Sequence, residues 1–342
     1  MRVAVYYNNH DVRIEQMPRP RIGPGELLIR VEAAGICGSD VMEWYRKDKV
    51  PLVLGHEISG IIEEIGEGLK GYKKGDRVVC AHHVPCGKCH YCLNGHETVC
   101  ETLRKTNFDP GGFAEFLRLP AINVEKGTYL LPERVSFEEA TFVEPLACVL
   151  RGQRQSGSIK GKCILVIGSG IAGLLHVHLA RASDAACIVA TDIVEYRLKQ
   201  AERFGADVSI LAKEYSTDII RQKNQGRLFD LVIVSTGAAS AILQALESVE
   251  RGGTILFFAP TDKGGQIPIS FNELFWRTEI TLSSSYAGSP QDYKQALDWI
   301  AGGKLNVTEM ITHRLGLEEI GSGFRLVSEA KDSIKVIIEP QK

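Results

Sequence analysis

The stretch "KCILVIGSGIAG", residues 162–173, constrains the fold more than any other part of the chain. An uninterrupted apolar run leads into Gly168-x-Gly170-x-x-Gly173, and a helical pattern follows over residues 172–182. A strand that is apolar on both faces is typical of a buried parallel sheet. The first glycine permits a tight turn, the second lets the backbone approach a pyrophosphate, and the third lets helix and strand pack closely. The stretch predicts the opening strand, turn and helix of a dinucleotide-binding domain.

Strand and helix patterns alternate after this fingerprint. Apolar runs at residues 187–192, 207–211, 229–236, 254–259 and 279–285 accompany helical patterns at 195–204 and 239–249. Such alternation predicts βαβ units and a doubly wound parallel sheet of the Rossmann type, which we assign to residues 151–285. A Rossmann-type sheet that binds no dinucleotide is the alternative.

The second strand of this domain ends in an acidic residue. Asp192 follows Gly173 by 19 residues. A carboxylate there binds the ribose hydroxyls and repels a 2′-phosphate, which favours NAD over NADP. Arg197 could flank the adenine or attract a 2′-phosphate, and we give Asp192 more weight. The candidate cofactor contacts are Gly168, Gly170, Ile171, Ala172, Gly173, Asp192, Arg197 and Thr236.

Residues 1–150 have a different character. Short alternating runs such as "ELLIRVEAAG" are separated by Gly, Pro and Gly-Asp turns, a pattern that predicts a β-rich domain. The terminal run "IKVIIEP" predicts a strand that returns to this domain, so residues 286–342 are assigned to it. The expected fold class is α/β, with a β-rich domain beside a doubly wound coenzyme domain.

Four of the nine cysteines form a lobe at about residues 82–102. The spacing Cys86-x2-Cys89-x2-Cys92-x7-Cys100 lets four thiolates surround one tetrahedral Zn²⁺, which leaves no open position and indicates a structural site. Unmetallated thiols are the alternative, and the turn residues disfavour a redox pair. Histidines and a glutamate in or near the lobe are expected to be solvent-facing loop residues rather than ligands: His82, His83, His90, His96 and Glu97.

A second metal site is suggested outside the lobe. Cys37 precedes His56 by 19 residues, and Glu57 follows His56 directly. A cysteine, a histidine and a carboxylate can form an open, catalytic zinc site. A lone buried cysteine is more often a small hydrophobic residue, so spacing alone leaves both readings open.

The chain resembles the zinc-dependent medium-chain dehydrogenase/reductase superfamily, which is alcohol dehydrogenase-like, and within it the sorbitol (polyol) and threonine dehydrogenase branch. The resemblance rests on "GICGSD", "LGHEISG", "KKGDRVV", "PCGKCHYC", "FVEPLA" and "VIGSGIAG". It implies a GroES-like catalytic domain and hydride transfer between a secondary alcohol and NAD, with a second zinc polarising the substrate oxygen. It also implies that Cys37, His56, Glu57 and Glu144 are ligands of that catalytic zinc, and that Ser39 begins a proton relay.

Three positions depart from the polyol dehydrogenase pattern. A frequent histidine is Met42, a substrate-contacting tyrosine is Glu43, and an Arg-Tyr pair is Ser285-Tyr286. Glu43, Ser285 and Tyr286 are therefore the candidate substrate contacts. The loss of a guanidinium and gain of a carboxylate disfavour acidic substrates and suit a neutral polyol or an amino alcohol such as threonine.

The remaining features exclude some classes of function. The net charge is −2 and no basic block stands out, so we expect no nucleic-acid partner. No apolar run is long enough to span a membrane and no signal peptide is recognised, so we expect a cytoplasmic protein. The resemblance implies a homodimer or homotetramer. A zinc-free reductase of the same fold and a zinc-knuckle binding module are the rival functions.

Overall fold

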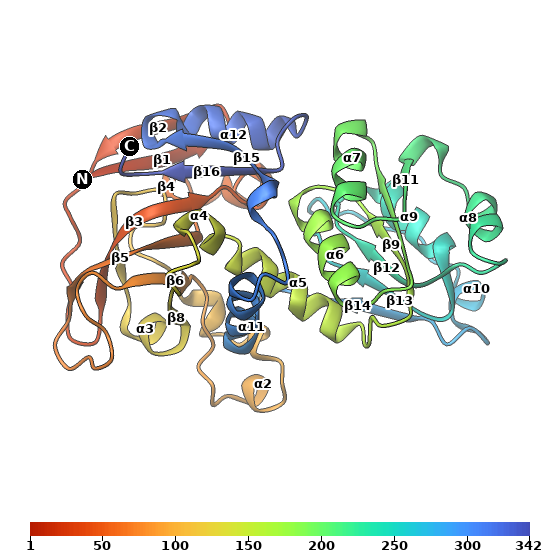
Figure 1. Ribbon diagram of the computed structural model, residues 1–342, viewed down its shortest axis with the longest axis horizontal. Coiled ribbons are helices and arrows are strands. Elements are labelled where there is room, and N and C mark those ends of the chain that lie inside the picture. The colour runs from red at the N-terminus through yellow and green to blue at the C-terminus, as the bar shows by residue number, and fades with distance from the viewer. The chain divides into compact units, whose positions relative to one another are not determined.

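The computed structural model describes residues 1–342, with Lys223 described by its backbone alone, and the chain divides into two units. Unit 1 comprises Met1–Ala147 with Ala287–Lys342, and unit 2 comprises Cys148–Tyr286. Figure 1 shows strands from both ends of the chain within unit 1 and a helix-flanked sheet in unit 2. None of the described helices has the length and apolar character needed to cross a bilayer.

Unit 1 is built on two sheets. The larger has the order β15-β16-β3-β5-β6-β8, with β7 also paired to β3, and the smaller has the order β2-β1-β4. Their strands are β1(Arg2–Asn8), β2(Asp11–Gln16), β3(Leu27–Gly35), β4(Leu52–Val53), β5(Glu57–Ile65), β6(Arg77–Ala81), β7(Phe116–Leu119), β8(Thr128–Leu130), β15(Ile311–Gly316) and β16(Lys335–Glu339). The helices of this unit are α1(Glu43–Arg46), α2(His90–Leu93), α3(Ala121–Gly127), α4(Phe137–Ala140), α11(Pro290–Ala301) and α12(Ile320–Glu329), and α5(Val143–Gln155) begins in it.

The C-terminal segment is an integral part of unit 1. β16 lies between β15 and β3, so the sheet would be interrupted without it. On α12, Phe324 packs against Tyr6 of β1 with ring centroids 5.4 Å apart. Both aromatic side chains are buried in the core of this unit. The predicted returning strand is β16.

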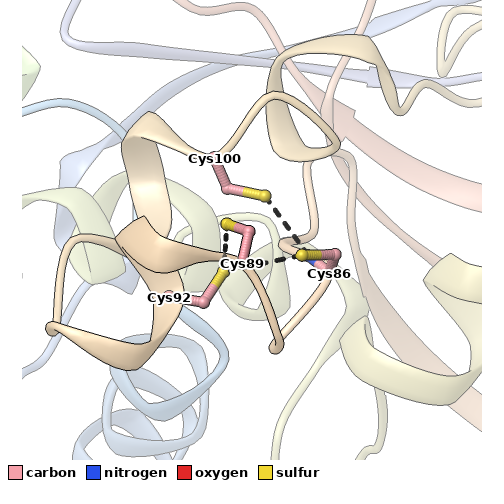
Figure 2. Close-up of side chains that lie close together, drawn as sticks. All are labelled: Cys86, Cys89, Cys92 and Cys100. Carbon is pink, nitrogen blue, oxygen red and sulfur yellow. Dashed lines mark hydrogen bonds between the residues drawn. The ribbon is translucent and has the colours of Figure 1, made fainter.

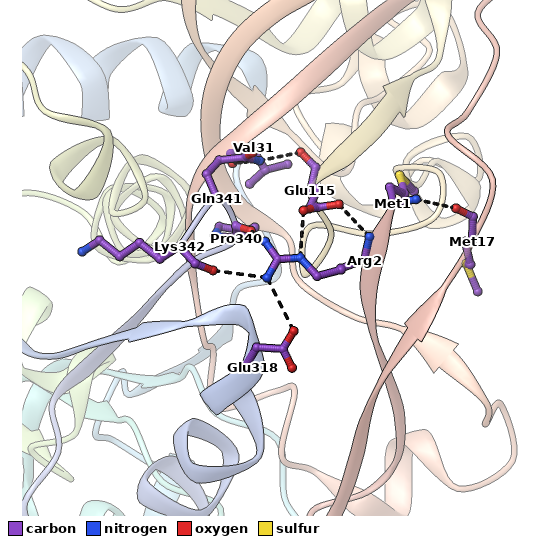
Figure 3. Close-up of polar contacts among 9 residues, drawn as sticks. All are labelled: Met1, Arg2, Met17, Val31, Glu115, Glu318, Pro340, Gln341 and Lys342. Atoms are coloured by element: carbon purple, nitrogen blue, oxygen red, sulfur yellow. Dashed lines mark hydrogen bonds and ion pairs between the residues drawn. The ribbon is translucent and has the colours of Figure 1, made fainter.

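Polar contacts also tie the two chain ends together, as Figure 3 shows. The Glu115 carboxylate accepts hydrogen bonds from the Arg2 backbone amide at 2.7 Å and from its Nε at 2.8 Å. The Arg2 guanidinium also donates to the carbonyls of Pro340 at 3.1 Å and Lys342 at 3.4 Å. Gln341 Nε2 donates to the Glu115 carbonyl at 2.9 Å. These bonds fix the last residues against the first strand.

Unit 2 is a six-stranded sheet with helices on its faces. The strand order is β11-β10-β9-β12-β13-β14, and every pairing is parallel. The elements are β9(Cys163–Ile167), α6(Ile171–Ala182), β10(Cys187–Asp192), α7(Glu195–Arg203), β11(Val208–Leu211), α8(Thr217–Lys223), β12(Phe229–Val234), α9(Ala239–Ser248), β13(Val249–Phe257), α10(Phe271–Phe275) and β14(Thr281–Ser284). The chain reverses direction across the sheet between β9 and β12, which is the doubly wound topology. The predicted fold class is confirmed.

Candidate functional site

The four cysteines of the lobe converge on one point, as Figure 2 shows. We call Cys86, Cys89, Cys92 and Cys100 the four-thiol cluster, since their sulfurs all lie within 4.8 Å of one another. The Sγ atoms are 3.5 Å apart for Cys89 and Cys92 and 3.9 Å apart for Cys86 and Cys92. Zn–S bonds of about 2.3 Å in a tetrahedron place sulfurs about 3.8 Å apart. The spacing of the sulfurs fits a zinc ion.

The pKa values of the thiols in the four-thiol cluster also indicate that a cation would stabilise it. Burial raises the pKa of Cys100, but backbone N–H groups that include the Cys86 amide outweigh it and lower the pKa to about 6. Burial and the neighbouring thiols raise the pKa of Cys92 to about 12. Four crowded sulfurs cannot all ionise without a positive charge among them, and a bound metal would supply it.

The other residues of the lobe do not join the cluster. His96 and His90 are exposed, and Glu97 begins the short turn Glu97–Val99 outside the set of ligand atoms. His82 and His83 differ from the expectation, because both are half-buried rather than solvent-facing. They follow directly after β6, whose end lies inside unit 1.

Cys37, His56 and Glu57 form a second group, which we call the open cluster. One ligand atom from each lies within 4.8 Å of the others. Cys37 follows the end of β3, and His56 and Glu57 stand at the start of β5. Gly55, just before His56, makes a turn with a φ of +95°. A Cβ at Gly55 would lie 2.7 Å from the Phe113 amide nitrogen, so the turn requires glycine. The turn brings two consecutive side chains to one point, where a regular strand would separate them.

Asp40 orients the open cluster, and the sequence reasoning missed it. Its carboxylate is fully buried, with Oδ2 accepting from the Cys37 amide at 3.0 Å and Oδ1 lying 3.4 Å from His56 Nδ1. Burial lowers the pKa of His56, but Asp40 and Cys37 outweigh burial and raise it well above its ordinary value. A carboxylate behind a histidine fixes the ring and leaves the other nitrogen for a metal. Only the short spacing within "CGSD" hinted at this role.

Glu57 has a partner that sequence reasoning also missed. Its Oε2 accepts a hydrogen bond from Lys335 Nζ on β16, and both side chains are buried, at 1% and 0% exposure. The pair crosses β3 at Gly35, the residue whose backbone pairs with both Glu57 and Ile337. A Cβ on Gly35 would lie 2.6 Å from Lys335 Cε, so only glycine leaves room for the ion pair. The C-terminal strand thus neutralises one candidate ligand.

The remaining predicted catalytic residues lie at different positions. Ser39 Oγ donates to Cys37 Sγ at 3.5 Å, so its hydroxyl adjoins the open cluster. Glu144 is half-buried in the first turn of α5 and is not among the described residues whose ligand atoms converge there. Glu43 is exposed, and its Oε1 accepts from the Asn9 amide at 2.9 Å. That bond gives Glu43 one partner within the protein, and its contact with substrate stays a prediction.

In unit 2 the glycine fingerprint lies between β9 and α6. Gly168 has a φ of +91°, and Gly170 is the N-cap of α6. A Cβ on Gly173 would clash with the Gly168 carbonyl oxygen, so the third glycine is needed for close packing. Ile171 and Ala172 form the first turn of α6, whose free amides suit a phosphate. Thr236 follows β12 and lies beside the loop: a Cβ added to Gly168 would be 3.2 Å from the Cβ of Thr236.

Asp192 stands at the end of β10 and faces the same loop. Its Oδ2 accepts from the Ser169 amide at 2.7 Å, and its Oδ1 accepts from the Val194 amide at 2.9 Å. Arg197 Nη1 lies 3.8 Å from a Cβ position on Gly170, and its Nε is buried without a hydrogen-bond partner. A carboxylate and a guanidinium thus flank the glycine loop. At the end of unit 2, the Ser285 hydroxyl is buried without a partner and Tyr286 is 51% exposed.

Comparisons with known proteins identify the family of the chain. Residues 23–130 match the alcohol dehydrogenase GroES-like domain, and residues 172–302 match the zinc-binding dehydrogenase domain. A probable D-xylulose reductase A of Aspergillus clavatus is 33% identical over 96% of this chain and 94% of its own length. An L-threonine 3-dehydrogenase of Bacillus velezensis is 32% identical over 97% of this chain and 96% of its own length. A zinc-binding dehydrogenase structure from Sinorhizobium meliloti 1021, bound to NADP, has a TM-score of 0.87 and 26% identity, covering 99% of each chain.

The family resemblance read from the motifs is therefore confirmed by domains, relatives and fold together. The relatives span nearly the whole chain, so both units are included in the match. The chain belongs to the zinc-binding alcohol dehydrogenase family, as an oxidoreductase of the polyol and alcohol type.

Proposed function

We propose that the protein oxidises a secondary alcohol, most favourably a neutral polyol, with NAD, and holds two zinc ions per chain. The observation that carries the proposal is the open cluster, in which Cys37, His56 and Glu57 offer three different ligand atoms within 4.8 Å. Three protein ligands with a free position are typical of a catalytic zinc site, whereas the four-thiol cluster is closed and suits a structural ion. Glu144 remains our candidate for a fourth or alternating ligand.

The residues of the chain have separate tasks in this reaction. Cys37, His56 and Glu57 would hold a zinc ion that lowers the pKa of the alcohol, and the glycine loop would hold the NAD that serves as hydride acceptor. Asp40 holds His56 in the orientation that the ligand set needs. Ser39, whose Oγ lies 3.5 Å from Cys37 Sγ, would begin the relay that accepts the proton of the substrate hydroxyl and passes on its own. Lys335 binds Glu57 Oε2 and would leave Oε1, which is buried without a hydrogen-bond partner, for the ion.

NAD is the proposed coenzyme because of Asp192. The carboxylate faces the glycine loop and would repel a 2′-phosphate. Arg197 beside the same loop would act in the opposite direction, and a relative in the family binds NADP. The ratio of kcat/KM for NAD to that for NADP should therefore favour NAD in the wild type and fall in Asp192→Ser. An unchanged ratio in Asp192→Ser would remove the basis for the assignment.

We also infer a homodimer or homotetramer in the cytoplasm. β14 is the last strand of the unit 2 sheet and offers an unpaired edge. Large apolar side chains that precede it in the chain are exposed: Ile269, Phe271 and Trp276. Zinc-binding thiolates need a reducing compartment, which favours the cytoplasm. Light scattering should give a molar mass of two or four times the 37.6 kDa of one chain, and the mass of a monomer would contradict the inference.

The substrate class is tested by reduction of NAD with sorbitol, xylitol, threonine and simple secondary alcohols. We expect turnover with the neutral polyols. Because Glu43 already accepts from Asn9, Glu43→Gln should leave the preference between neutral and amino alcohols unchanged. A strong preference for threonine that Glu43→Gln abolishes would favour an amino-alcohol dehydrogenase instead.

A further inference from the structure

His82 is a polar side chain without a partner next to the open cluster. Glu57 pairs with Ala81 in the antiparallel β5–β6 register, so His56 and His82 are the next residues in line on the two strands. Their ring centroids are 5.9 Å apart. The Nδ1 atom of His82 is buried without a hydrogen-bond partner, and no hydrogen bond to its Nε2 is found among the described residues.

The ring of His82 is nevertheless held in one orientation. It packs edge-on against Phe108 with centroids 4.9 Å apart and against His83 at 4.2 Å. A neutral imidazole carries one N–H and one lone pair, so a ring in this position can both donate and accept a hydrogen bond. A buried ring nitrogen without a hydrogen-bond partner is destabilising unless a ligand supplies the bond, and Nδ1 of His82 is such an atom.

The adjacent His83 shows the contrasting case. Its Nδ1 lies 2.8 Å from the Thr106 carbonyl oxygen, so one ring nitrogen is already bonded within the protein. His83 therefore has a structural explanation, and His82 has none. The difference lies in the partners of the two rings, because both follow the same strand and both are half-buried.

We propose that His82 hydrogen-bonds a second hydroxyl of the substrate, on the carbon beside the one that is oxidised, and so selects vicinal diols and polyols over monohydric alcohols. The inference rests on the proposed function, because it places the reacting hydroxyl at the open cluster. A ring so near His56 can contact the same small molecule that binds there. The fixed orientation of the ring means that little conformational entropy is lost when the bond forms.

The test compares two substrates that differ by one hydroxyl, butane-2,3-diol and butan-2-ol. His82→Phe keeps the ring that packs on Phe108 but removes both polar atoms, and His82→Gln restores a donor near the Nε2 position. His83→Phe is the matched control, as it is the neighbouring histidine with the same substitution. For each variant kcat and KM are measured on the zinc-loaded enzyme, and zinc per chain is determined by elemental analysis.

We expect His82→Phe to lower kcat/KM for the diol about tenfold or more, to leave butan-2-ol within about twofold, and to keep the wild-type zinc content. His82→Gln should recover part of the loss, and His83→Phe should leave the ratio of the two substrates unchanged. An unchanged ratio in His82→Phe would overturn the inference, as would an equal loss for both substrates accompanied by loss of zinc. If the wild type oxidised no alcohol, the proposed function itself would fail and this inference with it.

Discussion

Replacing Lys335 by methionine probes the buried ion pair with Glu57. The two side chains are 0% and 1% exposed, so the substitution leaves a carboxylate buried without its cation. Removing one partner of a buried pair costs about 3–5 kcal/mol. A domain of this size loses roughly 2–4 °C in melting temperature per kcal/mol, so the transition of unit 1 should fall by roughly 6–20 °C.

Differential scanning calorimetry of the protein without zinc at the open cluster measures this shift, because an ion bound to Glu57 would itself compensate the carboxylate. Lys342→Met is the matched control, because Lys342 is 64% exposed and pairs with Glu339 at the surface. An exposed pair contributes about 0–1 kcal/mol, so this control should melt close to the wild type. The double variant Glu57→Gln/Lys335→Met removes both charges and should recover most of the lost stability. If Lys335→Met melted together with Lys342→Met, the reasoning about the ion pair would be refuted.

Substitutions at Gly35, Asp40 and His176 test three other contacts. Gly35→Ala places a methyl group against Glu57 and Lys335 and should cost about 1–3 kcal/mol in unfolding free energy, measured by urea denaturation. Asp40→Asn should weaken zinc at the open cluster about 10–100-fold in chelator competition, with the four-thiol cluster unaffected. Burial lowers the pKa of His176 to about 3, whereas the unfolded chain binds a proton below about pH 6.5. Stability of unit 2 should therefore fall by about 2 kcal/mol from pH 7 to pH 5, and His176→Asn should flatten that dependence.

Much of unit 2 could be predicted from local patterns. The run "CILVI" is apolar on both faces because β9 is buried on both faces of the sheet, and the glycines that follow are required by one turn and one close contact. The cysteine spacing of the lobe predicted convergence because all four sulfurs come from one short segment. Periodicity and spacing are sufficient when the interacting residues are close in sequence.

The open cluster was less accessible to that reasoning. Lys335 contacts Glu57 across 278 positions, and no local pattern marks a lysine in an apolar strand as its partner. Asp40 and His82 depend on the directions of side chains at strand ends, which sequence periodicity does not give. Glu43 accepts from the Asn9 amide, a contact that no local pattern indicated, and its role toward substrate stays a prediction. Contacts between distant segments arise only once the sheet has formed.

Zinc content and turnover in Cys37→Ala test the assignment of a catalytic zinc site at the open cluster most directly. The open cluster needs this thiolate, while the four-thiol cluster lies apart from it and stabilises the lobe. We expect about two zinc ions per chain in the wild type, about one in Cys37→Ala, an unchanged fold by circular dichroism, and loss of alcohol-dependent NAD reduction. Cys163→Ala, a half-buried cysteine outside both clusters, should keep both ions and full turnover. Retention of two zinc ions and of turnover in Cys37→Ala would contradict the central claim.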